Sequence, residues 1–193
     1  MVDSIYLDGC SYVYGLNLNT EYNLESLFKN DGGYRMQNQS RPGKSNLAIA
    51  MDVFKYSESH DIIVVGWTHA TRFYLEVQGQ DIDFLPNRFN LDLKKLGDEE
   101  LIEHAYHQFH RYFYSMYQTP FIDNFSDMLI STVYEWLRSR GKRVVFFSFE
   151  PRKVDFDLYV PYTPPEFRLP CMHLNQKGTR YLFDLLQRKI SEQ

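Results

Sequence analysis

The chain has 193 residues, of which 44% are hydrophobic and 24% are charged, a balance typical of a soluble globular protein. Its length suits one compact domain with a sizeable core. The formal net charge is −4, and no run of like charge forms a binding tail. This composition lacks the basic field that nucleic-acid binding requires, so we expect no nucleic-acid partner.

The cysteine content and the hydropathy pattern bear on the compartment. Cys10 and Cys171 are the only two cysteines, whereas an oxidised scaffold normally has more, so a reducing compartment is expected. The sequence opens without a basic segment followed by an apolar run, and no apolar stretch approaches the ~20 residues that span a bilayer. These features predict a cytoplasmic protein with no membrane partner.

The first half of the chain alternates predicted strands and helices. Short runs of β-forming residues and helical spacing of apolar residues predict, in order, a strand at 4–7, a helix at 21–29, a strand at 34–39, a loop at 38–44, a helix at 45–56 and a strand at 61–66. The last run, Asp-Ile-Ile-Val-Val-Gly, is continuously apolar after its first residue, as a strand covered on both faces requires.

The second half continues the alternation after an interruption. It is predicted to contain an irregular excursion or lid at 79–97, helices at 98–117 and 124–140, a strand at 143–149, a Pro-rich loop at 151–170 and a helix at 175–190. This order predicts an α/β fold with three layers, in which helices cover both faces of a mostly parallel sheet, as a single domain over residues 1–193. Sites in such sheets form beyond the carboxyl ends of the strands.

Two segments place chemically active side chains where a site is expected. Ser11 follows the first strand on a tight turn near a predicted helix start, where small neighbours let backbone N–H groups face a developing oxyanion. His173 lies in the loop before the last helix, and a neutral imidazole is the usual base for a serine hydroxyl. Serine is also a common helix cap and a single histidine is often a surface residue, so neither segment decides alone.

Two further segments offer donors for an oxyanion. Gly43 and Asn46 follow the second predicted strand, and Thr68 follows the third, in the sequence Gly-Trp-Thr-His. The Gly43 N–H and the side chain of Asn46 or Thr68 are suitable hydrogen-bond donors. Both segments are also consistent with ordinary polar turns.

Together these segments resemble the SGNH (GDSL-like) hydrolase family along nearly the whole chain. Gly-Cys-Ser at 9–11, with the trailing Gly15, is similar to the family's Gly-Asp-Ser block, and Gly43 is similar to its second-block glycine. Gly-Trp-Thr-His at 66–69 lies where the family has Gly-x-Asn-Asp. His173 and the Leu-Asn-Gln-Lys-Gly that follows it resemble the block that carries the family's catalytic histidine.

The resemblance implies a flavodoxin-like three-layer fold and a serine hydrolase without cofactor or metal. It implies Ser11 as the nucleophile, His173 as its base, and the N–H groups of Ser11 and Gly43 in the oxyanion hole. The sequence departs from the family at three places: Cys10 replaces the first-block Asp, Thr68 replaces an Asn donor, and Pro170 replaces the Asp that orients the histidine. A backbone carbonyl, Asp8 or a carboxylate of the 79–97 segment remain candidates for that orienting role.

The predicted function is hydrolysis of an ester, with an O-acetyl or other short acyl group on a carbohydrate or small molecule as the expected substrate. We assign Trp67, His69 and Arg72 to substrate binding, with Arg72 suited to an acidic group. Alternatively Trp67 fills the core and Arg72 pairs with Glu76. A binding or structural module with weak or no activity, and acyl transfer in place of hydrolysis, are alternative functions. A homo-oligomer is compatible with the sequence.

Three histidines recur at every third position within the predicted helix at 98–117. His104, His107 and His110 therefore share part of a helix face, but no cysteine or carboxylate cluster accompanies them, so we expect no metal site. The same helix is rich in aromatic residues, which we expect to be core.

Overall fold

The computed structural model describes residues 2–77, 80–85, 88–89, 107–108, 111–112, 115, 120–149, 154, 158–160 and 165–193. Its named elements are β1 (Ser4–Gly9), α1 (Ser11–Tyr14), η1 (Thr20–Tyr22), α2 (Leu24–Asn30), β2 (Arg35–Asn38), α3 (Asn46–Tyr56), β3 (Ile62–Trp67), β4 (Phe73–Val77), β5 (Gln80–Leu85), β6 (Arg88–Phe89), α5 (Phe121–Ser139), β7 (Arg143–Ser148), β8 (Leu158–Tyr159), η3 (Pro165–Phe167) and α6 (Gln176–Ser191).

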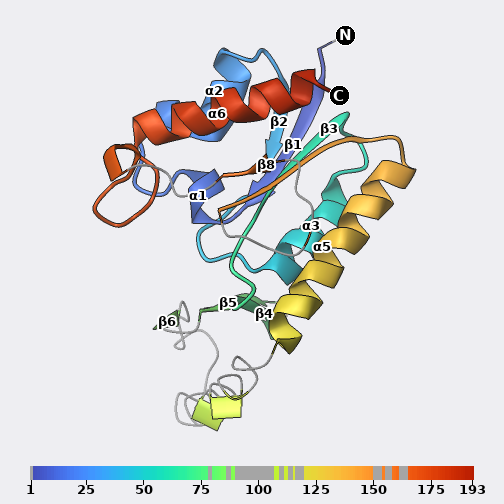
Figure 1. Cartoon of the computed structure of the whole chain (residues 1–193), viewed down its shortest axis with the longest axis vertical. Helices are drawn as coiled ribbons and strands as arrows, with labels where there is room; N and C mark the ends of the chain where they lie inside the picture. The colour runs from blue at the N-terminus through green and yellow to red at the C-terminus, as the bar shows by residue number, and fades with distance from the viewer. Residues whose placement is uncertain are drawn as a thin grey trace.

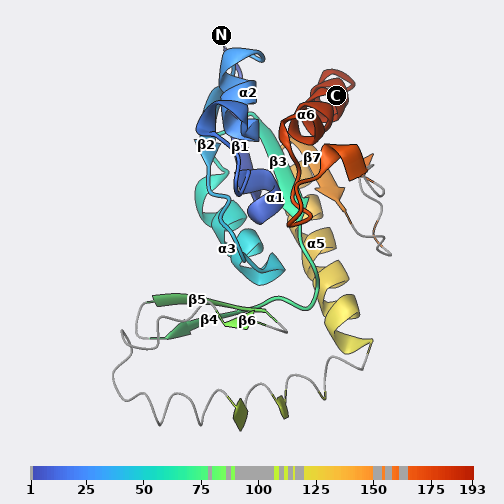
Figure 2. The ribbon, with the colours of Figure 1, turned by 90° about the vertical axis from the view of Figure 1, so that its left-hand side faces the viewer.

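The centre of the fold is a parallel sheet of five strands in the order β2-β1-β3-β7-β8. Helices α2 and α6 lie together on one face, and α3 and α5 lie together on the other (Figures 1 and 2). The predicted three-layer α/β/α architecture is therefore confirmed, and each of its four predicted strands corresponds to a strand of this sheet.

Alternation along the buried strands divides the core in two. On β1 and β3, Leu7 and Val64 pack with α2 and α6, whereas Tyr6 and Val65 pack with α3 and α5. Successive strand residues point to opposite faces, so a strand covered by helices on both sides must be apolar at every position. The side chains of β1 and β3 are accordingly buried throughout, and complete burial of one such aliphatic side chain contributes about 1.5–3 kcal/mol.

Three helices begin at residues whose side chains cap the first turn. The side-chain oxygen of Asn23 accepts a hydrogen bond from the Ser26 N–H at the start of α2, and Ser45 caps α3 in the same way. Asn175 caps α6, accepting from the Gly178 N–H at 3.0 Å. These caps satisfy N–H groups that have no partner within the helix, and fix where the helices next to the site begin.

The segment after β3 differs from the prediction. Strands β4, β5 and β6 form a separate antiparallel sheet, so the irregular chain expected from residue 79 contains two strands. The alternation Asp-Ile-Asp-Phe at 81–84 has the period of a strand, but its acidic composition obscured that signal. In Figure 2 this small sheet lies below the main one, and β4 contacts α3.

Other predictions for the second half have mixed outcomes. The predicted loop at 151–170 contains the two-residue strand β8 and the short helix η3. Most of the predicted helix at 98–117, including His104 and His110, lies outside the described residues. Much of the 79–97 segment also lies outside them, so its expected role as a lid stays a prediction. In the described parts of the chain, no helix has the length and apolar character needed to cross a bilayer.

Candidate active site

Two glycines at the carboxyl ends of neighbouring strands allow the Ser11 turn to form. Gly9 has φ +153°, and a Cβ there would lie 2.4 Å from Cγ2 of Val13 and 2.8 Å from the Gly66 carbonyl oxygen. Gly66 pairs with Gly9 across the sheet, and its Cβ would lie 2.5 Å from the same Val13 methyl. The short helix α1 can therefore pack directly on the end of the sheet, and Ser11 is its first residue.

The hydroxyl of Ser11 and the imidazole of His173 meet at this edge of the sheet. Ser11 Oγ lies 2.9 Å from His173 Nε2, although 162 positions separate the two residues in sequence. Ser11 is 4% exposed, and His173 lies in the loop that precedes α6. The ring of Tyr12 lies 5.1 Å from the His173 ring and limits its movement on one side. The geometry suits proton transfer from a serine hydroxyl to an imidazole.

The opposite side of the imidazole faces a thiol. His173 Nδ1 lies 3.4 Å from Cys171 Sγ, and the ring also forms a hydrogen bond with the Cys171 backbone. If Nε2 accepts the Ser11 proton, Nδ1 must carry the hydrogen of the neutral ring, and the Cys171 groups accept it. No carboxylate among the described residues forms a hydrogen bond with His173. The Cys171 backbone and the Cys171 thiol therefore lie where a group that orients the imidazole is expected. A backbone carbonyl was one of the candidates that the sequence left open for this role.

The loop that carries this thiol has unusual backbone geometry. Among the described residues, Asn17 and Met172 are the non-glycine residues with positive φ, at 67° and 69°. Met172 separates Cys171 from His173, and Asn17 Nδ2 donates a hydrogen bond to Cys171 Sγ at 3.4 Å. A non-glycine residue in the left-handed region costs about 1–3 kcal/mol and tends to occur at functional sites. Both strained residues thus adjoin the groups that contact the histidine.

The surroundings shift the pKa values of both side chains downward. Burial lowers the pKa of His173, and the nearby positive charge of Arg72 lowers it further, while the Cys171 backbone opposes the shift. Hydrogen bonds from the His173 backbone N–H and from Asn17 lower the pKa of the Cys171 thiol. The imidazole is therefore held in its neutral form, which is the form that accepts a proton.

Gly43 lies in a tight turn that is hydrogen-bonded to the end of β1. The Lys44 N–H donates to the Arg41 carbonyl, Pro42 occupies the second position of the turn, and Gly43 has φ +82° in the third. These are the features of a type II turn, which requires positive φ at its third position. The Arg41 N–H also donates to the Gly9 carbonyl at 3.2 Å, so the turn is joined to the end of β1.

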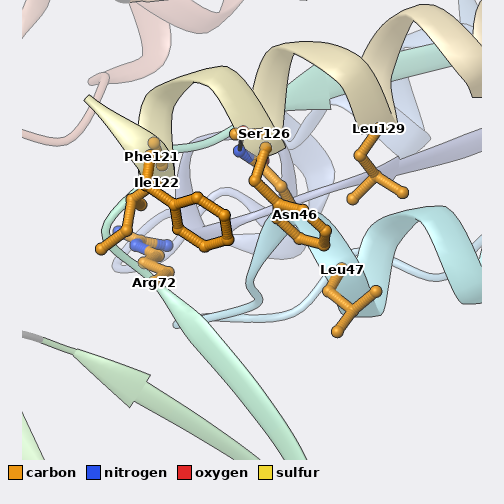
Figure 3. A pocket seen from close by; sticks show the side chains of 9 residues that line it. Asn46, Leu47, Arg72, Phe121, Ile122, Ser126 and Leu129 are labelled. Carbon is orange, nitrogen blue, oxygen red and sulfur yellow. Dashed lines mark hydrogen bonds between the residues drawn. The ribbon is translucent and has the colours of Figure 1, made fainter. Parts of the chain in front are cut away.

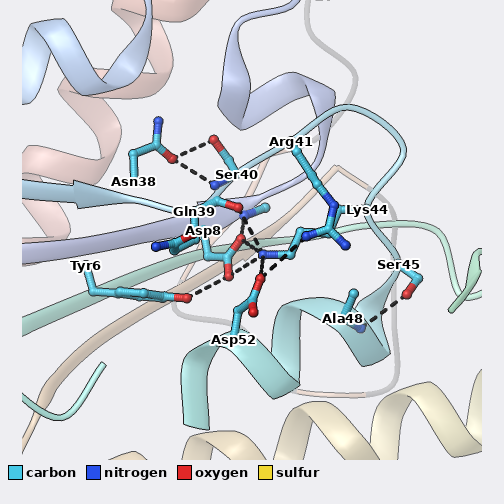
Figure 4. A network of polar contacts seen from close by, with 11 residues as sticks. Tyr6, Asp8, Asn38, Gln39, Ser40, Arg41, Lys44, Ser45, Ala48 and Asp52 are labelled. Carbon is cyan, nitrogen blue, oxygen red and sulfur yellow. Dashed lines mark hydrogen bonds and ion pairs between the residues drawn. The ribbon is translucent and has the colours of Figure 1, made fainter. Parts of the chain in front are cut away.

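A buried ion pair between Lys44, the last residue of this turn, and Asp8 holds the turn against the end of β1 (Figure 4). Lys44 Nζ lies 2.5 Å and 2.7 Å from the two Asp8 oxygens and 2.6 Å from an Asp52 oxygen, and the Lys44 and Asp8 side chains are fully buried. The Tyr6 hydroxyl donates to Asp8 at 2.8 Å. Burial raises the pKa of Asp8 to about 6 and also raises the pKa of Tyr6, while Lys44 opposes the shift at Asp8.

This network excludes one candidate for the group that orients His173. The Asp8 carboxylate accepts hydrogen bonds from Lys44, Tyr6 and the Gly9 N–H, and it does not contact the imidazole. The side chains of the 79–97 segment lie outside the described residues. Asp8 instead joins the strand that leads to Ser11 to the turn that carries Gly43.

Asn46 has a structural role in place of the expected donor role. Its Oδ1 accepts from the Thr68 N–H at 2.9 Å, and its Nδ2 donates to the Thr68 carbonyl at 3.0 Å and to Ser126 Oγ at 2.7 Å. Both amide hydrogens are used, so Asn46 has none for an oxyanion. It holds the Thr68 peptide at the end of β3, and Thr68 is itself buried.

The last residue of β3 is buried in the core, whereas residues in the turn that follows are half-buried. Trp67 is 2% exposed and packs edge-on against Phe146 with ring centroids 5.1 Å apart, which supports the alternative that it fills the core. It continues the β3 alternation of Ile63 and Val65 toward α3 and α5. His69 and Arg72 are half-buried in a turn closed by the Arg72 N–H and the His69 carbonyl, and the structure does not test a role for His69.

Several of these contacts were not predicted from the sequence. The pairing of Asp8 with Lys44 had only a weak signal, namely a charged residue at the end of an apolar strand. Cys171 had none beyond its position two residues before His173. Of the three recurring histidines only His107 is described, and the described residues contain no group of three potential metal ligands.

Comparison with solved structures supports the fold and no finer detail. The chain is similar to TesA, with a TM-score of 0.58, 11% identity and coverage of 97% of both chains. It is also similar to the psychrotrophic esterase EstA from Pseudoalteromonas sp., in a structure inhibited by monoethylphosphonate, with a TM-score of 0.56, 8% identity and coverage of 98% of this chain and 97% of that one. No protein-family model and no curated protein sequence matches the chain.

The comparisons therefore support the fold of the chain. It has a three-layer α/β/α fold similar to the folds of TesA and of the esterase EstA.

Proposed function

We propose that this protein is a serine esterase in which Ser11 is the nucleophile and His173 is the general base. The observation that carries the proposal is the distance of 2.9 Å between Ser11 Oγ and His173 Nε2 at the carboxyl edge of the sheet. The lowered pKa of His173 supports it, since a general base must be unprotonated near neutral pH.

The proposed reaction has two steps. Ser11 Oγ attacks the ester carbonyl carbon while its proton passes to His173 Nε2, and the tetrahedral intermediate then breaks the ester C–O bond. The leaving alcohol takes the proton from the imidazolium, and an acyl-Ser11 intermediate remains. His173 next accepts a proton from water, whose oxygen attacks the acyl carbonyl carbon to form a second tetrahedral intermediate. The bond between that carbon and Ser11 Oγ then breaks, Oγ takes the proton back from the imidazolium, and the acid leaves.

The oxyanion of each tetrahedral intermediate would be held by backbone N–H groups. Ser11 is the first residue of α1, so its N–H has no carbonyl partner within that helix. The Gly43 turn is joined to the same strand end through the Arg41 N–H and the Gly9 carbonyl, which supports the Gly43 N–H as the second donor. One such donor is typically worth about 10²–10³ in rate. The side-chain hydroxyl of Thr68 is the proposed third donor, because its backbone N–H is bonded to Asn46.

The proposed substrate is a short acyl ester, such as an O-acetyl group, on a carbohydrate or small molecule. A binding module with weak or no activity is the alternative, and one observation favours it: no carboxylate among the described residues supports His173. The two functions differ in whether Ser11 reacts at all.

Hydrolysis of a chromogenic short-chain ester tests the proposal. We expect turnover by the purified protein, and a fall of at least about 10³-fold in kcat for both Ser11→Ala and His173→Gln. Ser131→Ala is the matched control, because Ser131 lies exposed on α5 and bonds only the Asp127 carbonyl of its own helix. Absence of turnover by a folded wild-type protein, or equal turnover by Ser11→Ala, would contradict the proposal.

A further inference from the structure

A pocket of about 260 Å³ lies between the N-terminal turns of α3 and α5 and the loop after β3. Its walls are almost entirely apolar. In Figure 3, Leu47 and Leu129 lie at one end, and Phe121 and Ile122 lie at the other beside Arg72. The volume is below the ~300–1,000 Å³ that accommodates a drug-sized ligand, so it suits one arm of a substrate.

Arg72 contributes the cationic group of this pocket. Its Nη1 atom is buried and has no hydrogen-bond partner in the structure. A buried N–H donor without a partner is costly, and the cost is greater for a charged group. A guanidinium binds carboxylates through two parallel N–H···O bonds, so an anionic ligand group would satisfy Nη1.

The pocket is linked to the proposed reaction centre through Asn46 and through the charge of Arg72. Asn46 lines the pocket, and its amide binds both the Thr68 peptide and the pocket residue Ser126. The positive charge of Arg72 also acts on the imidazole of His173. One substrate can therefore place its ester at Ser11 and an arm in the pocket.

We propose that the esterase acts on esters that carry a short apolar chain ending in a carboxylate, with the chain in this pocket and the carboxylate paired with Arg72. The proposal rests on the proposed function for its reaction, and on the pocket and Arg72 for its specificity. Within the proposed class of short acyl esters, it favours a substrate that carries a carboxylate over a neutral acetylated sugar, which would leave Nη1 without a partner.

A binding experiment tests the specificity without catalysis. Hexanoate and hexanamide have the same chain and differ in charge, and both can be titrated calorimetrically into the Ser11→Ala protein. We expect hexanoate to bind at least about tenfold more tightly, and Arg72→Gln in the same background to abolish that preference. Arg138→Gln is the control, because Arg138 is an exposed arginine in the last turn of α5; it should leave the preference unchanged.

A kinetic experiment tests the same point in the active protein. The 4-nitrophenyl monoester of adipic acid and 4-nitrophenyl hexanoate present the same chain with and without a carboxylate. We expect kcat/KM to favour the adipate ester, and Arg72→Gln to reduce that ratio by about tenfold or more, whereas Arg72→Lys retains part of it.

The outcomes separate this inference from the proposed function. Equal binding of hexanoate and hexanamide, or a preference that survives Arg72→Gln, overturns the inference even if the protein is an active esterase. Absence of turnover with an Arg72-dependent preference for hexanoate overturns the proposed function and keeps the anion-binding pocket.

Discussion

His173 Nδ1 lies 3.4 Å from Cys171 Sγ, on the side of the imidazole opposite Ser11. The SGNH resemblance implies a carboxylate in this position, and the sequence has Pro170 where that Asp is expected. A thiol with a lowered pKa, held by Asn17 and by the His173 backbone N–H, is a weaker acceptor that still favours one ring tautomer. Cys171 is therefore a positioning residue in the proposed mechanism.

Replacing this thiol should affect turnover more than substrate binding. We expect Cys171→Ala to lower kcat by about tenfold with little change in KM, because the imidazole loses an acceptor that holds its orientation. Cys171→Asp should retain activity and move the acidic limb of the pH profile to higher pH, since a nearby carboxylate raises the pKa of a histidine. An unchanged kcat in Cys171→Ala would show that the backbone contact alone orients the ring.

The pH profile of kcat/KM should report the lowered pKa of His173. The base is active only when neutral, so activity falls as pH drops through its pKa, and burial and Arg72 place that limb below the ordinary histidine value of about 6.5. Arg72→Gln removes a positive charge, raises the pKa of His173 and should move the limb to higher pH. Arg138→Gln should not move it, and a limb that shifts to lower pH in Arg72→Gln would contradict this assignment.

The buried ion pair beneath the Gly43 turn should contribute strongly to stability. Lys44→Met leaves the buried Asp8 without its cation and leaves Asp52 with the longer pair to Arg41 at 3.6 Å, and loss of one partner of a buried pair costs about 3–5 kcal/mol. Urea unfolding followed by circular dichroism measures the change. The control Lys189→Met removes only a surface pair with Glu192, worth about 1 kcal/mol or less. A similarly small loss in Lys44→Met would mean that the network is not tightly coupled.

The close packing of α1 on the sheet predicts that Gly9 tolerates no side chain. Gly9→Ala forces a methyl group against Val13 and the Gly66 carbonyl, and we expect a loss of about 1–3 kcal/mol together with reduced esterase activity, because Ser11 moves with α1. Gly141→Ala is the matched control, since Gly141 also has positive φ but its Cβ would meet no atom within 4 Å. It should lose some stability and retain activity.

Four of the five strands of the main sheet could be predicted because their pattern is local, whereas the two-residue strand β8 lies in a predicted loop. The continuous apolar runs at β1, β3 and β7 indicate strands covered on both faces, and the structure has them in one parallel sheet. The hairpin strand β5 was missed because Asp81 and Asp83 alternate with its apolar residues, and acidic composition was interpreted as irregular chain.

The parts of the candidate site that could be predicted are those that follow from the order of strands and helices along the chain. Ser11 and His173 follow or precede elements whose ends meet at one edge, so their meeting follows from the topology. The roles of Asn46, Trp67 and Cys171 depend on which atoms they contact. These contacts depend on the tertiary structure, and sequence spacing does not reveal them. The Asn46 amide hydrogens bond Thr68 and Ser126, the Trp67 ring packs in the core, and the Cys171 thiol contacts the imidazole of His173.

The most direct test is covalent labelling with a fluorophosphonate probe followed by intact-mass and peptide mass spectrometry. We predict one adduct per chain, located on Ser11. It should be absent from Ser11→Ala, form much more slowly in His173→Gln and be unchanged in Ser131→Ala. A folded wild-type protein that takes up no probe, or an adduct that persists in Ser11→Ala, would contradict the assignment of Ser11 as an activated nucleophile.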